Sequence, residues 1–297
     1  MNIRFDDRVA IVTGAGGGLG RAYALALARR GAKIVVNDLG GARDGTGTPT
    51  SAAQSVAEEI NALGGAAIAN GCSVTDEEGV TGMVAEAREK WGRVDILVNN
   101  AGILRDKSFA KMSIADFRQV VEVHLMGSVI ATKAVWDVMR EQNYGRILMT
   151  TSATGLYGNF GQTNYGAAKL GLVGFMNSLG IEGAKNNIHV NTIAPAAATR
   201  MTEDILPADV LGKMGPDTVV PAALFLVSEQ APNRATLAAG GGGFERAHIT
   251  LTRGVRLSAS EMTPEAVAVH FDAIGSRDGE IVPDGVFAQS AMAFGQI

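Results

Sequence analysis

Three side chains between residues 152 and 169 have the types and spacing to move a proton. Tyr165 and Lys169 are four residues apart, which places both on one face of a helix. An ammonium group nearby favours the phenolate form of a tyrosine, whose ordinary pKa of about 10 is too high for a base at neutral pH. Ser152 follows 146–151, a run typical of a buried strand, and its hydroxyl could hold the same substrate oxygen. The three residues therefore indicate acid–base chemistry on an alcohol or carbonyl group.

A tyrosine–lysine pair alone is weak evidence, because such pairs also occur on ordinary surface helices. The elements that precede it strengthen the interpretation. A β-branched run over 9–13 leads into the glycine-rich segment 14–20. An Ala- and Leu-rich helix over 21–30 and a strand over 33–37 follow, and the strand ends at Asp38. This order is the fingerprint of a dinucleotide-binding unit, in which the glycines admit a pyrophosphate and the acid accepts hydrogen bonds from a ribose. A carboxylate at that place repels a ribose phosphate, which favours NAD over NADP.

Alternating strand and helix patterns continue along the chain. We expect further strands over 66–69, 94–98, 146–151 and 188–193, and helices over 51–63, 76–91, 114–123, 125–141 and 165–184. This alternation, without a break in composition, predicts an α/β fold with a Rossmann-type doubly wound parallel sheet of six or seven strands. Residues 1–245 would form the dinucleotide-binding domain with its active site, and 246–297 a short C-terminal extension.

Composition narrows the class of protein. The 297 residues are 46% apolar and 19% charged, which suits a large core and argues against disorder. A net charge of −4 and 5% aromatic residues argue against a nucleic-acid surface. The single cysteine, Cys72, excludes a disulfide framework, and no apolar run reaches membrane-spanning length. Because residues 1–8 are polar, we expect no secretory signal and a soluble, cytoplasmic protein.

Four motifs together carry a family resemblance. They are Thr13-Gly14-x-x-x-Gly18-x-Gly20, Asn99-Asn100-Ala101-Gly102, Ser152 with Tyr165-x-x-x-Lys169, and Asn191-Thr192-Ile193-Ala194-Pro195. In this order and spacing they resemble the short-chain dehydrogenases/reductases, over residues 5–245. The stretches 20–26, 36–41, 102–106 and 157–162 give a closer resemblance, to the (3R)-hydroxyacyl-CoA dehydrogenase unit of the type-two multifunctional enzymes of β-oxidation, in a stand-alone, bacterial-type form.

The resemblance implies a role for each matching residue. Tyr165 is implied to be the general acid/base, Lys169 to lower its pKa and hold the nicotinamide ribose, and Ser152 to bond the reacting oxygen. The residues implied to bind the cofactor are Gly14, Gly18, Leu19, Gly20, Asp38, Ser73, Val74, Asn100, Ala101, Gly102, Tyr165, Lys169, Pro195 and Thr199. A plain turn is the alternative for 99–102. We expect no metal site, because the histidines lack ligand spacing.

Some positions depart from the family pattern. His124 stands where many members carry asparagine, and two interpretations are open. It joins a water relay that drains the proton from Lys169, or it is a core histidine whose hydrogen bonds are satisfied. Cys72 replaces a common aspartate near the adenine, and we expect it to be a small buried residue. The segment from Ala196 to Thr199 is one residue shorter than the family pattern.

The residues beyond the glycine run 240–243 exceed the usual length of the family. Alternating apolar residues over 247–251 predict a strand, and Thr263-Pro264-Glu265 predicts the start of a short amphipathic helix that ends before Gly275. Such a helix needs a surface to lie on. We expect it to cover the domain itself or a neighbouring subunit; a second hypothesis is that it narrows the acyl pocket.

These features predict an NAD-dependent oxidoreductase that oxidises a secondary alcohol. By resemblance the substrate is a (3R)-hydroxyacyl-CoA, and the product a 3-oxoacyl-CoA of fatty-acid or steroid side-chain β-oxidation. Two alternatives use the same scaffold, a 3-oxoacyl reductase and a hydroxysteroid dehydrogenase. A non-catalytic NAD(H)-binding regulator is the alternative from another class. We expect a homodimer or homotetramer, because the helices over 125–141 and 165–184 are apolar on more than one side.

Overall fold

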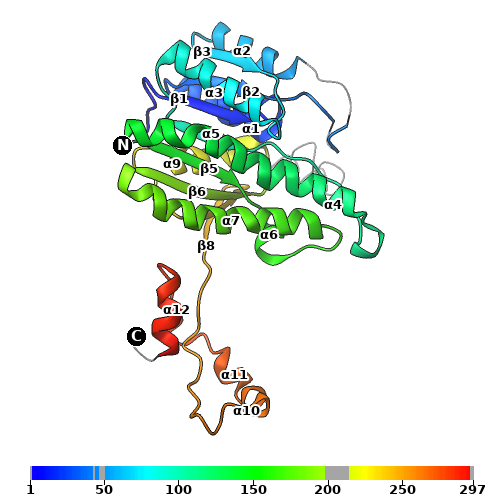
Figure 1. Cartoon of the computed structure of the whole chain (residues 1–297). Helices are drawn as coiled ribbons and strands as arrows, with labels where there is room; N and C mark the ends of the chain where they lie inside the picture. The colour runs from blue at the N-terminus through cyan, green and yellow to red at the C-terminus, as the bar shows by residue number, and fades with distance from the viewer. Residues whose placement is uncertain (1, 43, 47–50, 198–213, 295–297) are drawn as a thin grey trace. The chain divides into compact units, whose positions relative to one another are not determined.

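The computed structural model describes residues 2–42, 44–46, 51–197 and 214–294. Contacts within the chain divide it into two units, Met1–Arg246 and Ala247–Ile297, which are described separately below (Figure 1).

An eight-stranded sheet forms the centre of the first unit, with the strand order β3-β2-β1-β4-β5-β6-β7-β8. Its strands are β1 (Val9–Thr13), β2 (Lys33–Asn37), β3 (Ala66–Asn70), β4 (Ile96–Asn99), β5 (Gly145–Thr150), β6 (Ile188–Pro195), β7 (Thr236–Gly240) and β8 (Gly243–Ala247). All the pairs from β3 to β7 are parallel. Every residue of β1, β4 and β5 is buried, as expected for parallel strands covered on both faces.

Helices cover the two faces of this sheet. Those of the first unit are α1 (Gly18–Arg29), α2 (Ala52–Ala62), α3 (Glu77–Trp91), α4 (Ile114–Val121), α5 (Gly127–Gln142), α6 (Ala153–Tyr157), α7 (Thr163–Gly183) and α9 (Val220–Leu226), with short turns η1 (Phe109–Lys111), η2 (Glu122–Met126), η3 (Ala184–Asn186) and η4 (Pro216–Thr218). Tyr23 of α1 and Ile60 of α2 belong to the core on one face. Met83 of α3, Val135 of α5 and Leu172 of α7 belong to the core on the other.

The predicted Rossmann-type, doubly wound parallel sheet is confirmed, although it has eight strands instead of six or seven. The strands whose ranges were predicted within the sheet lie within two residues of their expected ends. Two expectations about helices need correction. The first helix begins at Gly18, inside the glycine segment, instead of at 21. The two helices expected over 114–123 and 125–141 are one continuous helical run, because η2 joins α4 to α5 by a π-helical turn. Helices α6 and α9 were not predicted.

The second unit consists of three short helices, α10 (Pro264–Val269), α11 (Phe271–Ile274) and α12 (Val286–Ala293). The strand predicted over 247–251 is absent from its described residues: β8 ends at Ala247, and Leu251 forms only an isolated bridge with Ile281. The predicted amphipathic helix is divided at His270 into α10 and α11. None of the described residues 247–294 is buried, so this unit has no core of its own.

The strand order reverses between β1 and β4, because β2 and β3 lie on one side of β1 and the later strands on the other. In doubly wound sheets such a reversal opens a crevice at the carboxyl ends of the strands. The segments that follow β1, β2, β4 and β5 all start at this edge. They contain Gly14, Asp38, Asn100 and Ser152, so the fold brings distant parts of the chain to one place.

Candidate active site

Tyr165 and Lys169 lie in the first two turns of α7, as their spacing predicts. The Lys169 amine is 5.4 Å from the centre of the Tyr165 ring. Lys169 is almost fully buried, and its Nζ donates a hydrogen bond to the carbonyl oxygen of Thr150 at 2.6 Å, at the end of β5. Asn164 is also buried, and its Oδ1 accepts a hydrogen bond from the backbone N–H of Tyr165 at 2.8 Å. These bonds fix the start of α7 against the edge of the sheet.

Ser152 follows β5 and begins α6, where its hydroxyl accepts a hydrogen bond from the backbone N–H of Thr154 at 3.1 Å. Its side chain also bonds the Tyr165 hydroxyl and thereby lowers the pKa of Tyr165. Serine, tyrosine and lysine are therefore brought together by the strand end and the helix that the sequence indicated.

The electrostatics of this group differ from the expectation. Burial is the largest influence on Tyr165 and raises its pKa to about 12, against the smaller effect of Ser152. Burial also lowers the pKa of Lys169 to about 7, because a desolvated ammonium is disfavoured. Lys169 thus loses much of the positive charge that would stabilise a phenolate. The prediction that the lysine makes the tyrosine acidic is wrong for the protein's own groups.

His124 lies in the π-helical turn η2 and faces Tyr165. The two rings are 5.1 Å apart between centroids and nearly perpendicular, at 88°. His124 Nε2 lies 2.7 Å from the carbonyl oxygen of Ile103. The backbone N–H of Ile103 also lies 3.1 Å from Nε2, so Nε2 donates or accepts according to the tautomer of the ring. Nδ1 is buried and has no hydrogen-bond partner among the described residues. Burial and the nearby Lys169 hold the pKa of His124 well below its usual value.

Each of the two interpretations of His124 made from the sequence agrees with part of this geometry. One ring nitrogen is hydrogen-bonded, as in a core histidine, whereas the other is buried without a partner among the described residues, in a ring that contacts Tyr165. Gly102 makes the close approach possible: a Cβ built there would lie 2.2 Å from His124 Cε1. The glycine of the Asn-Asn-Ala-Gly motif is therefore required by the histidine.

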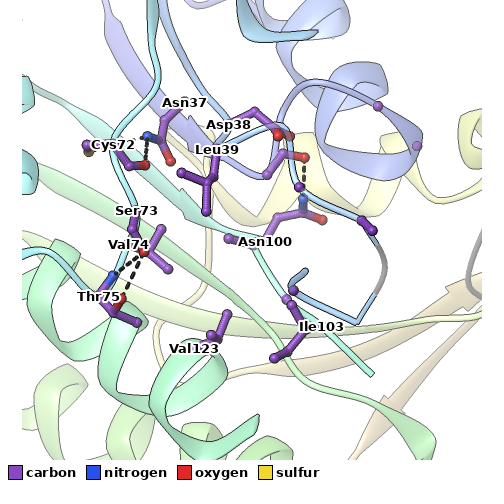
Figure 2. Close-up of a pocket in the computed structure, with 18 of the residues that line it drawn as sticks. Asn37, Asp38, Leu39, Cys72, Ser73, Val74, Thr75, Asn100, Ile103 and Val123 are labelled. Atoms are coloured by element: carbon purple, nitrogen blue, oxygen red, sulfur yellow. Dashed lines mark hydrogen bonds between the residues drawn. The ribbon is translucent and has the colours of Figure 1, made fainter. Parts of the chain in front are cut away.

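A cavity of about 290 Å³ opens beside this group, above the carboxyl ends of β1, β2 and β4. Figure 2 shows its lining, with Asp38, Leu39 and Asn100 on one side and Val123 and Ile103 on another. Nine expected cofactor-binding residues line it: Gly14, Gly18, Leu19, Asp38, Ser73, Val74, Asn100, Ala101 and Gly102. Within the described part of the chain, Gly20, Tyr165, Lys169 and Pro195 are outside this lining. Thr199 lies outside the described residues.

The glycine segment has the shape that the fingerprint requires. Gly14 and Gly18 have positive φ angles of 63° and 52°, which favour glycine. A Cβ at Gly14 would lie 2.8 Å from the Cα of Ala101. A Cβ at Gly20 would lie 2.2 Å from the carbonyl oxygen of Gly14, so Gly20 permits close packing of α1 on the glycine segment.

Asp38 presents a carboxylate to the cavity (Figure 2). Its Oδ2 accepts a hydrogen bond from the backbone N–H of Gly16 at 2.8 Å, and its Oδ1 one from Gly40 at 2.7 Å. Asn100, which also lines the cavity, donates from Nδ2 to the carbonyl oxygens of Thr13 and Gly14 at 3.0 and 3.1 Å. The asparagine therefore braces β4 to β1.

Sequence reasoning missed part of the cavity lining. Leu39, Gly41, Ala42, Gly45, Ile103, Gln119 and Val123 also line it. Cys72 lines it too and is only half-buried, so the expectation of a simple buried residue is wrong. The missed residues come from the segment after β2, from the segment after β4 and from the helical run of α4 and η2, none of which has a local signal for a ligand.

Two classes of feature are not found in the described residues. They contain no group of three His, Cys, Asp or Glu side chains placed to hold a metal ion. No helix among them is long and apolar enough to cross a membrane.

Comparison with known proteins decides the family. A family model described as short chain dehydrogenase matches residues 8–209. The chain belongs to this short-chain dehydrogenase family. It is 52% identical over 275 residues to the peroxisomal multifunctional enzyme type 2 of Mus musculus, over 92% of this chain and 37% of that protein. The short-chain dehydrogenase thus spans little more than a third of that relative's length.

Solved structures agree with this assignment. A short chain dehydrogenase from Mycobacterium avium superposes with a TM-score of 0.78 and 36% identity, over 91% of this chain and 95% of that chain. A 7α-hydroxysteroid dehydrogenase complexed with NADH and 7-oxo glycochenodeoxycholic acid superposes with a TM-score of 0.73 and 33% identity, over 82% of this chain and 96% of that chain. The short-chain dehydrogenase fold therefore extends over most of the chain.

Proposed function

We propose that this short-chain dehydrogenase uses NAD to oxidise a secondary alcohol, with Tyr165, Ser152 and Lys169 as its catalytic residues. The observation that carries the proposal is the junction of the two sites. His124 contacts the Tyr165 ring and bonds Ile103, which lines the cavity beside Asp38. A single residue, His124, thus connects the proton-transfer group to the cleft for the dinucleotide.

The residues of the cavity fit a nicotinamide dinucleotide. Gly14 and Gly18 have positive φ angles, and Gly18 begins α1, so the glycine segment turns into the amino-terminal end of this helix, which suits a pyrophosphate. Asp38 would accept hydrogen bonds from the adenosine ribose hydroxyls and would repel a phosphate on that ribose. Ser73 and Val74 would border the adenine. This arrangement favours NAD over NADP.

The chain's own groups divide the proton chemistry among them. When bound, NAD would accept a hydride from the carbinol carbon, and its positive ring would favour the Tyr165 phenolate. Tyr165 takes the hydroxyl proton of the substrate as general base. Ser152 stabilises the charge that develops on the same oxygen. Lys169, with its pKa lowered to about 7, can pass on a proton at neutral pH. Nδ1 of His124, which is buried and has no partner among the described residues, would hydrogen-bond a water beside this group.

A (3R)-hydroxyacyl-CoA is the substrate that we propose, with a 3-oxoacyl-CoA as product. Its support is the 52% identity with the multifunctional enzyme of mouse and the matching stretches noted above. The test is a panel of 3-hydroxyacyl-CoA substrates of both configurations and several chain lengths, assayed with NAD and with NADP. Turnover of the (3R) series with NAD is expected. Preference for the (3S) series, or for NADP, would contradict the proposal.

A hydroxysteroid is the second candidate substrate, favoured by the superposition with a 7α-hydroxysteroid dehydrogenase. Including hydroxysteroids in the same panel distinguishes the two. A regulator without turnover remains the alternative of another class; NADH binding without activity toward any alcohol would support it.

Assembly into a homodimer or homotetramer is proposed on the apolar surface of α7, where Leu170 is 45% and Ile181 56% exposed. Sedimentation equilibrium of the purified chain tests this; a monomer at micromolar concentration would contradict it. A cytoplasmic location stays a prediction, to be tested by fractionation of the source cells.

A further inference from the structure

The segment that follows β4 is tied to the catalytic helix. Ile103 lines the cofactor cavity. Two residues later, the carbonyl oxygen of Arg105 accepts a hydrogen bond from Asn164 Nδ2 at 3.1 Å. Asn164 in turn bonds the backbone N–H of Tyr165. The backbone at Arg105 therefore has a fixed position relative to the first turn of α7.

The side chain of Arg105 joins two other elements. Its Nε donates a hydrogen bond to the carbonyl oxygen of Asp44 at 3.1 Å. Its Nη1 donates to Asp116 Oδ1 at 3.0 Å, in the first turn of α4. The side chains of Arg105 and Asp116 are 26% and 17% exposed, so water screens their ion pair only in part. A guanidinium donates to the two acceptors from two separate nitrogens, whereas a lysine ammonium carries all its donors on one terminal nitrogen.

The Asp44 carbonyl belongs to the segment after β2 that forms the other wall of the cavity. Leu39, Gly41, Ala42 and Gly45 from this segment line it. Gly45 lies against Ile103: a Cβ at Gly45 would be 3.2 Å from Ile103 Cγ2. The bond from Arg105 and this contact therefore hold two walls together, one after β2 and one after β4, at the same side of the cavity.

We propose that Arg105 is a latch, a positioning residue that holds residues 44–46 against 103–105 and slows the release of the dinucleotide. The inference rests on the proposed function, because it needs a nicotinamide cofactor in the cavity. Loss of the latch frees the wall after β2 while the catalytic side chains keep their own hydrogen bonds. The expected effect is faster cofactor release.

Stopped-flow measurement of NADH dissociation from the full chain tests the latch. Arg105→Met removes both donors and keeps the aliphatic stem. Its expected NADH off-rate is about tenfold higher than that of the wild type, the usual effect of losing one hydrogen bond from a charged donor. Arg118→Met is the matched control, because Arg118 is an exposed arginine of α4 for which no side-chain partner is seen in the described residues. Equal off-rates in the two variants would overturn the proposal.

Two more readouts separate a latch from a general structural role. Arg105→Lys keeps the charge beside Asp116 but has no donor in the place of Arg105 Nε, which bonds the Asp44 carbonyl. Its off-rate should therefore match that of Arg105→Met, and a wild-type rate would overturn the bridging role. A lowered unfolding midpoint with an unchanged off-rate would also overturn it. Failure of the wild type to bind NADH or NADPH would overturn the proposed function itself, whereas normal NADH binding with an unchanged off-rate in Arg105→Met overturns the latch alone.

Discussion

Replacing Tyr165 by phenylalanine removes a single oxygen atom and tests the central assignment. The ring stays, and with it the perpendicular contact with His124. Ser152 keeps its hydrogen bond from the Thr154 N–H. The free energy of unfolding should therefore change by no more than about 1 kcal/mol, the usual worth of one hydrogen bond. Any large loss of activity is then chemical and not a consequence of misfolding.

The size of the expected loss follows from the proton transfer. A group with a pKa of about 12 is ionised in roughly one molecule in 10⁵ at pH 7. The chain's own groups thus keep Tyr165 as a phenol, and the bound cofactor must shift it. Removing a general base typically lowers the rate by a factor of about 10² to 10⁴. We expect a fall in kcat within this range, with NADH affinity nearly unchanged.

The assay is steady-state oxidation of a (3R)-hydroxyacyl-CoA, combined with NADH titration by fluorescence. Tyr157→Phe is the matched control, because Tyr157 is 75% exposed and lies on the neighbouring helix α6. A Tyr165→Phe enzyme with a kcat within threefold of the Tyr157→Phe enzyme would refute the assignment. Titration of Tyr165 near pH 7 in the cofactor-free protein, followed by tyrosinate absorbance, would refute the argument from burial.

Three other predictions concern the cofactor site and the core. Asp38→Asn should weaken NAD binding about tenfold and reduce the preference for NAD over NADP, because a charged hydrogen-bond acceptor is lost. Calorimetry that shows an equal loss of affinity for NAD and for NADP would contradict this role of Asp38. The pKa of Lys169 is about 7 when folded and 10.5 ordinarily, so the unfolded chain binds the extra proton between these values and stability rises with pH there. Lys169→Met should reduce the gain in unfolding free energy from pH 7 to pH 9 by about 2 kcal/mol in urea titrations; an identical gain would contradict the buried, neutral amine. Gly102→Ala should lower the free energy of unfolding by about 1–3 kcal/mol, because the new Cβ would meet His124. Gly82→Ala is the control: it has open space around it in α3 and should raise the free energy of unfolding by about 0.5–1 kcal/mol. Equal stability of the two variants would contradict the close contact between residue 102 and His124.

The sheet and the glycine segment could be predicted because their signals are local. A β-branched run such as Val9–Thr13 is typical of a buried parallel strand wherever it occurs. The positive φ angles of Gly14 and Gly18 are likewise a property of the turn itself. The same holds for Tyr165 and Lys169, since one helical turn fixes their separation.

The features that escaped prediction depend on tertiary contacts. The direction of the pKa shift at Tyr165 is set by burial, which the spacing of two residues in a helix does not reveal. The wall formed by Leu39 and Gly45 comes from a segment whose composition is typical of a mobile loop. The interruption at His270 and the helix α12 lie in a unit without buried residues. Local hydrophobic pattern is a poor guide there.

The π-helical turn Glu122–Met126 constrains the number of residues that the chain can have between α4 and α5. Such a turn holds one residue more than a regular helix would use, and each residue of a regular helix rotates its successors by about 100°. Val120 before the turn and Ala131 after it are both buried. Deleting one residue would regularise the hydrogen bonding but turn one of these faces outward. Insertions and deletions in homologous proteins should therefore be excluded from this stretch, although no sequence motif marks it.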